Sequence, residues 1–210
     1  MGIAWTTHMR FEKSLLEDQV WQDAKASGCK YLHFGYESGN ERVLKLMDKA
    51  TTTEIMTKHL KYTAEAGIWN HCMGFFGFPG ETREEAWSSV EFLEQNKDYV
   101  HSLGFGTFDL GRHNPVAKHP EKFGVTAYKN PEWDLALDYY FTVKQGLSIE
   151  EAERVFEEFE RNHNPGWDLR LFIREYIFLY IAQFGLQKLP DLQFRSARVA
   201  TVPPSLAGKM

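Results

Sequence analysis

Short apolar runs alternate with amphipathic stretches over the first half of the chain. The runs at 30–35 and 72–77 have the length and aromatic content of buried strands. Between them, Ile55, Leu60 and Ala64 share one face of a helix whose other positions are polar. Repeated strand–helix order predicts a parallel α/β arrangement with right-handed crossovers. The expected strands lie at 3–5, 30–35, 72–77 and 99–108, and the expected helices lie at 15–25, after 51 and after 82.

Paired glycines reveal a repeated unit in this region. Gly28 and Gly67 each follow a helical stretch that ends in small residues, and Gly35 and Gly74 lie seven residues further on. The period of 39 residues is about what one strand, one helix and two loops require. We therefore expect Gly28 and Gly67 to end their helices in the left-handed conformation, which glycine adopts without steric cost.

Four segments carry the signature of a helix start. A hydroxyl residue followed three positions later by glutamate, the capping-box spacing, occurs at 38–41, 51–54, 82–85 and 148–151. In such a box the hydroxyl accepts a hydrogen bond from an otherwise unpaired backbone N–H group. We therefore expect a helix to begin at each of these places.

Composition changes beyond residue 110. The segment 111–131 holds three prolines and two glycines with weak periodicity, so we expect a linker or long loop. Helical patterns follow at 133–144, 148–161 and 167–184. The expected division is an α/β unit at 1–110, a linker or long loop at 111–131 and a mainly α-helical region at 132–210.

The overall composition excludes several classes of protein. With 210 residues, 43% hydrophobic and 25% charged, the chain is globular rather than disordered or collagen-like. A formal charge of −5 argues against a nucleic-acid partner. The most apolar stretch, 171–186, is interrupted by Arg174 and Glu175, which argues against a membrane span. The two cysteines, Cys29 and Cys72, make no disulfide framework and no metal site, which favours a cytoplasmic location.

Candidate chemistry gathers where two predicted strands end. Ligands of parallel α/β sheets bind beyond the carboxyl ends of the strands. After the strand at 30–35, Glu37 and Ser38 offer acceptors for hydroxyl groups. After the strand at 72–77, Gly77 permits close backbone approach and Phe78 offers a stacking face. We expect both turns to lie side by side and to bind one nucleoside-like molecule. A pairing of Glu37 with a nearby arginine and an N-cap role for Ser38 remain open.

The same residues belong to an ordered series that resembles a known family. The series comprises Gly-Tyr-Glu-Ser-Gly-Asn-Glu-Arg-Val-Leu-Lys-Leu-Met-Asp-Lys at 35–49, Ala-Gly-Ile at 66–68 and Gly-Phe-Pro-Gly-Glu-Thr at 77–82. It resembles the second half of a radical S-adenosylmethionine (SAM) enzyme barrel, in the branch with cobalamin-dependent and methylthiolating members. The resemblance implies a partial (β/α) barrel that binds SAM on a 4Fe-4S cluster. It also implies reductive cleavage of SAM to a 5′-deoxyadenosyl radical.

The resemblance implies roles for five residues in cofactor binding. Glu37 and Ser38 fall where the family contacts the SAM ribose, and Lys49 falls where it meets the methionyl carboxylate. Gly77 and Phe78 fall on the motif beside the adenine. No residue is assigned a catalytic role, and neither the resemblance nor the residues identify a substrate.

The chain also departs from the family pattern. The cluster motif of three cysteines spaced C-x3-C-x2-C is absent, because Cys29 and Cys72 are 43 residues apart. The glycine-glycine-glutamate motif for the SAM amino group and the Pro-Gly-Thr that follows the sixth strand are also missing. The sequence therefore predicts a fragment, a truncated product or a degenerate relative, which alone does not cleave SAM.

One consequence follows from that prediction, and two alternative functions remain open. A half-barrel leaves strand edges unpaired, so we expect self-association or pairing with a missing N-terminal half-barrel. One alternative is a non-catalytic SAM-like or partner-binding module. The other is an unrelated barrel enzyme that binds a phosphorylated ligand at its helix N-termini.

Overall fold

A parallel four-stranded sheet forms the centre of the computed structural model, which describes residues 2–128, 137–162 and 174–186. The strands are β1 (Trp5–Met9), β2 (Cys29–Glu37), β3 (Trp69–Phe76) and β4 (Ser102–Thr107), in the order β1-β2-β3-β4. All three pairings are parallel, as the sequence predicts. The described residues form a partial (β/α) barrel that does not close.

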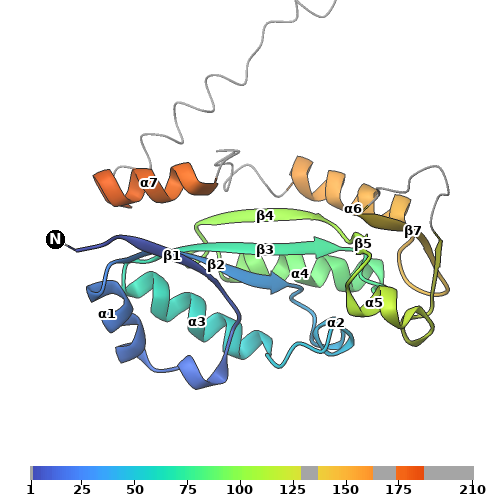
Figure 1. The fold of residues 1–210 in the computed structure, drawn as a ribbon, viewed down its shortest axis with the longest axis horizontal. Helices are drawn as coiled ribbons and strands as arrows, with labels where there is room; N and C mark the ends of the chain where they lie inside the picture. Colours follow the sequence, from blue (N-terminus) through green and yellow to red (C-terminus); the bar gives the residue numbers. More distant parts are fainter. Residues whose placement is uncertain (1, 129–136, 163–173, 187–210) are drawn as a thin grey trace, which may run out of the picture.

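Helices pack against both faces of this sheet (Figure 1). Side chains alternate along β2, so Leu32 and Phe34 lie in the main core, whereas Tyr31 lies on the other face. The first face is covered by α1 (Asp18–Ala26), α3 (Thr53–Glu65) and α4 (Arg83–Gln95). Ile181 of α7 (Arg174–Phe184) packs on Tyr31 from the second face.

Local sequence signals explain most helix ends. Thr82 and Glu85 form a complete capping box at α4, and Ser148 and Glu151 form another before α6 (Ile149–Asn162). Gly28 and Gly67 follow their helices with φ of 110° and 74°, the left-handed values expected. The remaining starts, at α2 (Glu41–Leu46) and α3, are capped by Asn40 and Thr52 rather than by Ser38 and Thr51.

The helix expected at 133–144 is wrong over the part that the structure describes. Residues Asp138–Val143 form strand β7, which pairs antiparallel with β5 (Leu110–Gly111) and β6 (Val125–Tyr128). Phe141 is buried between exposed neighbours, so burial follows the two-residue period of a strand. Residues 129–136 lie outside the described part.

The segment expected to be a linker or loop contains regular structure. It holds α5 (Pro115–Lys118), the 3-10 helix η2 (Pro120–Phe123) and β6. Pro115 and Pro120 begin the two short helices, and Gly124 ends η2 with a φ of 63°. Proline and glycine here mark the ends of elements. The three-part domain division itself stays a prediction.

Helix α6 agrees with the helix expected at 148–161. Helix α7 lies within the helix expected at 167–184, of which residues 167–173 are outside the described part. Among the described helices, none combines the length and apolarity needed to cross a membrane. A further 3-10 helix, η1 (Lys13–Leu15), precedes α1.

Candidate functional site

A pocket of about 740 Å³ opens at the carboxyl ends of the parallel strands. This volume lies within the range of small-molecule sites. Helices α2 and α5 lie at the end of the sheet toward which β2 and β3 point (Figure 1). The walls come from the segment after β1, the end of β2, residues 46–51, the turn after β3 and residues 114–123. The pocket is therefore where ligands of this fold class bind.

Glu37 and Lys49 face each other in this pocket. Lys49 Nζ donates to Glu37 Oε1 at 2.9 Å, and the two side chains are 29% and 22% exposed. Glu37 has a φ of 62° beside an irregularity in the β2–β3 pairing. A Cβ at Gly35 would lie 2.9 Å from Glu37 Oε1, so the carboxylate needs the space that glycine leaves. The partner of Glu37 is therefore Lys49 and not Arg42.

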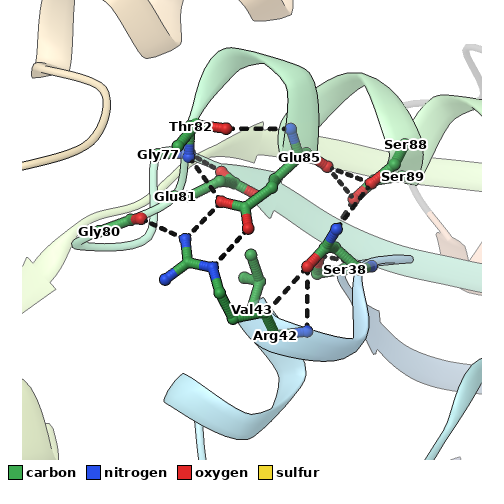
Figure 2. A network of polar contacts seen from close by, with 11 residues as sticks. Ser38, Arg42, Val43, Gly77, Gly80, Glu81, Thr82, Glu85, Ser88 and Ser89 are labelled. Atoms are coloured by element: carbon green, nitrogen blue, oxygen red, sulfur yellow. Dashed lines mark hydrogen bonds and ion pairs between the residues drawn. The ribbon is translucent and has the colours of Figure 1, made fainter.

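Arg42 instead joins the two turns that follow β2 and β3. Its guanidinium pairs with Glu85 and donates to the Gly80 carbonyl at 2.6 Å (Figure 2). Hydrogen bonding to Arg42 lowers the pKa of Glu85. Because Arg42 and Glu85 are 43 residues apart, no local sequence signal reveals this contact. Sequence reasoning missed Arg42 as the residue that holds the turns together.

Ser38 belongs to a buried hydroxyl network between the turn after β2 and helix α4. Its side chain is fully buried, with Oγ 3.0 Å from Ser89 Oγ, and it accepts a hydrogen bond from the Asn40 backbone N–H at 3.1 Å. The Gly39 N–H donates to Ser89 Oγ at 2.9 Å. Because Ser89 belongs to α4, these contacts tie the turn after β2 to the helix that follows β3 (Figure 2). Ser38 is outside the pocket lining, and its contact with ribose stays a prediction.

Gly77 also lies outside the pocket lining. Its φ is 86°, and a Cβ there would lie 2.5 Å from Ala152 Cβ of α6. Its N–H donates to Glu81 Oε2 at 2.6 Å, which closes the turn over a fully buried carboxyl group (Figure 2). Burial raises the pKa of Glu81 to about 7, although hydrogen bonds from backbone N–H groups oppose the rise. Gly77 thus shapes the turn that presents Phe78.

Phe78 lies in an aromatic wall of the pocket. It meets Phe108 and Phe123 edge to face, with ring centroids 5.3 and 5.9 Å apart, and Phe75 lies 6.5 Å away. All four rings line the pocket, although Phe78 itself is only 5% exposed. The structure thus brings Glu37, Lys49 and Phe78 around one pocket; their contact with a cofactor stays a prediction.

The two cysteines do not fit a 4Fe-4S cluster. Cys29 and Cys72 are fully buried in the main core, and burial raises the pKa of Cys29 to about 11 and that of Cys72 still further. The thiolate is the form that binds metal, so burial disfavours both as ligands. Among the described residues, no group of three histidine, cysteine or acidic side chains is arranged to hold a metal ion.

The family model for the radical SAM superfamily matches residues 5–93. Residues 5–93 therefore form the radical SAM segment of the chain. It contains β1–β3 and the helices between them, together with most of α4. The superfamily uses SAM and a 4Fe-4S cluster, and the described part of this chain holds no ligand set for the cluster. The family match does not support the alternative of an unrelated barrel enzyme.

Two curated proteins are similar to parts of this chain. An uncharacterised methyltransferase of Pyrococcus horikoshii is 31% identical over 97 residues, 45% of this chain and 20% of the relative. The cytidylyl-2-hydroxyethylphosphonate methyltransferase of Streptomyces wedmorensis is 27% identical over 180 residues, 80% of this chain and 33% of the relative. The chain thus spans a third or less of the length of these relatives.

A solved structure shows the same fold. Coproporphyrinogen III oxidase of Escherichia coli, a radical SAM enzyme, matches with a TM-score of 0.54 at 15% identity. The match covers 75% of this chain and 31% of that chain. At this identity, the likeness concerns the arrangement of strands and helices alone.

Proposed function

We propose that the pocket binds SAM and that the chain is the SAM-binding part of a radical SAM methyltransferase. The observation that carries this proposal is one pocket shared by Glu37, Lys49 and Phe78 at the carboxyl ends of the strands. A bound 4Fe-4S cluster would supply one electron to SAM, which would break its sulfur–C5′ bond and give methionine and the 5′-deoxyadenosyl radical. The cluster ligands belong to a segment other than this chain, because the chain has only two cysteines and both are buried.

The three residues suit three different parts of SAM. The Glu37 carboxylate accepts hydrogen bonds from ribose hydroxyls, and the aromatic wall around Phe78 receives the adenine. Lys49 has three N–H donors, of which one goes to Glu37, so donors remain for the methionyl carboxylate. The pocket thus offers an apolar wall for the base and charged groups for the polar ends.

Methyl transfer is the reaction class that the relatives favour. Two curated relatives are named as methyltransferases, and one of them aligns with 80% of this chain. A non-catalytic SAM-binding module is the second candidate, favoured by the absence of cluster cysteines from the chain. An assay of methyl transfer after addition of a cluster-bearing partner distinguishes the two candidate functions, since a non-catalytic module stays inactive.

Calorimetric titration of the full chain with SAM tests the proposal. Glu37→Gln and Lys49→Met should each weaken binding about tenfold or more, because each removes a charge-assisted hydrogen bond. Glu91→Gln and Lys97→Met are matched controls, since both residues are exposed and line no part of the pocket. Affinities within twofold of wild type for all four variants would contradict the proposal.

A further inference from the structure

A fully buried histidine lies behind one wall of the pocket. His59 of α3 is 0% exposed and lies among three aromatic rings. The ring centroids of Phe11, Trp21 and Phe34 are 5.8, 5.5 and 6.4 Å from that of the imidazole. Burial of an imidazole in such surroundings costs free energy unless its nitrogen atoms find hydrogen-bond partners. Apolar packing therefore does not explain why a histidine stands at this position.

The polar contact of His59 is with the segment that follows β1. Its Nε2 atom lies 2.9 Å from the backbone oxygen of Glu12. A carbonyl oxygen only accepts, so Nε2 carries the proton and donates. Burial lowers the pKa of His59, which favours the neutral ring with Nδ1 unprotonated. Among the described residues Nδ1 has no hydrogen-bond partner, so the polar side of this ring is directed at Glu12.

The segment that His59 contacts is a wall of the pocket. Residues 10–12 line the pocket and lie between β1 and η1 without regular secondary structure. Phe11 stacks on Phe34 of β2, with ring centroids 4.5 Å apart. The Glu12 carbonyl also accepts from an N–H of η1 at 3.0 Å, but that contact is local. The hydrogen bond from His59, 47 residues away, ties the wall to helix α3.

We propose that His59 is a positioning residue, which holds the wall at 10–12 in the place that SAM binding requires. His59 lines no part of the pocket, so it acts through the Glu12 backbone. Its helix is itself fixed, because Met56 and Leu60 of α3 are fully buried in the main core. A wall that is already ordered loses less conformational freedom when a ligand binds, which raises affinity. This inference rests on the proposed function and adds a residue that supports the pocket from behind.

Calorimetric titration of the full chain with SAM compares two substitutions at this position. His59→Leu is apolar and has no donor, whereas His59→Gln supplies an amide N–H near the position of Nε2. We expect His59→Leu to weaken SAM binding about tenfold, the effect of one lost hydrogen bond, and His59→Gln to stay within about threefold of wild type. Leu93→Ala leaves a cavity in the same core but lies outside the pocket lining. It is the control for lost stability and should bind SAM as wild type does.

Nuclear magnetic resonance follows the same contact without a substitution. In wild type with isotope-labelled histidine, SAM should shift the Nε2 resonance of His59. The ring nitrogen resonances of His101, which accepts a hydrogen bond from the Asn70 N–H, should stay unchanged. This measurement decides the question even where His59→Leu does not fold.

The possible results separate this inference from the proposed function. A His59 Nε2 resonance that is unchanged at saturating SAM, or wild-type affinity in His59→Leu, would overturn the inference. Equal losses in His59→Leu and in either His59→Gln or Leu93→Ala would assign the effect to core packing and overturn it as well. If wild type binds no SAM, the proposed function itself fails.

Discussion

The buried carboxyl group of Glu81 predicts an unusual dependence of stability on pH. Burial raises its pKa from 4.5 to about 7, and the opposing hydrogen bond from the Gly77 N–H only partly offsets this. The native state therefore keeps its proton over a pH range in which the unfolded chain loses it. Stability is highest below the unfolded pKa and falls as pH rises through the native pKa. The total loss is about 3 kcal/mol, at about 1.4 kcal/mol per pH unit.

Comparison of wild type with Glu81→Gln isolates this effect. The amide has the same size and still accepts a hydrogen bond from Gly77, but it does not titrate. Between pH 5 and pH 8 wild type should lose about 2 to 3 kcal/mol relative to Glu81→Gln, measured by urea denaturation of the full chain. Glu91→Gln, which removes an exposed carboxylate from the helix that follows, α4, is the control. An equal stability difference between wild type and Glu81→Gln at both pH values would refute the reasoning.

Three further predictions concern the turn, the cysteines and the sheet edges. Gly77→Ala should destabilise the chain by about 2 to 4 kcal/mol in urea denaturation, since a Cβ there meets Ala152 at a φ of 86°; a loss below about 0.5 kcal/mol contradicts this. Reconstitution of the chain alone with iron and sulfide should show no 4Fe-4S absorption, because Cys29 and Cys72 are buried; a stable 4Fe-4S spectrum contradicts this. Light scattering should show self-association, because no described strand covers the outer edges of β1 and β4; a monodisperse monomer contradicts this.

Local signals were sufficient for the elements that build the site. Glycine after a helix, the capping box at Thr82 and the aromatic strand runs act over a few residues, so sequence patterns identify them. The meeting of the two turns was also predictable, because parallel neighbouring strands end at the same edge of a sheet. The pocket position therefore followed from topology.

Contacts between distant residues were not predictable in the same way. Glu37 lies near Arg42 in sequence, which favours an ion pair between them. In the structure the backbone of Glu37 is left-handed, and its carboxylate forms an ion pair with Lys49 instead. Arg42 is then paired with Glu85 in the first turn of helix α4. The burial of Ser38 depends on Ser89, which is 51 residues away, so it leaves no local sequence signal. A ligand contact was therefore predicted for Ser38.

The sequence of strand β7 favours a strand, although a helix was predicted there. The sequence Asp-Tyr-Tyr-Phe-Thr-Val alternates in burial and is rich in aromatic and β-branched residues, which favours a strand. The helix predicted at 133–144 overlaps this strand. In the structure, pairing with β5 and β6 stabilises the strand instead. Tertiary pairing thus decided the structure of residues that were ambiguous locally.

A crystal structure of the full chain with bound SAM tests the central claim most directly. We expect the adenosyl group between Glu37 and the aromatic wall around Phe78, with the methionyl carboxylate at Lys49. SAM bound outside this pocket, or bound in it with its carboxylate directed away from Lys49, would contradict the proposed function.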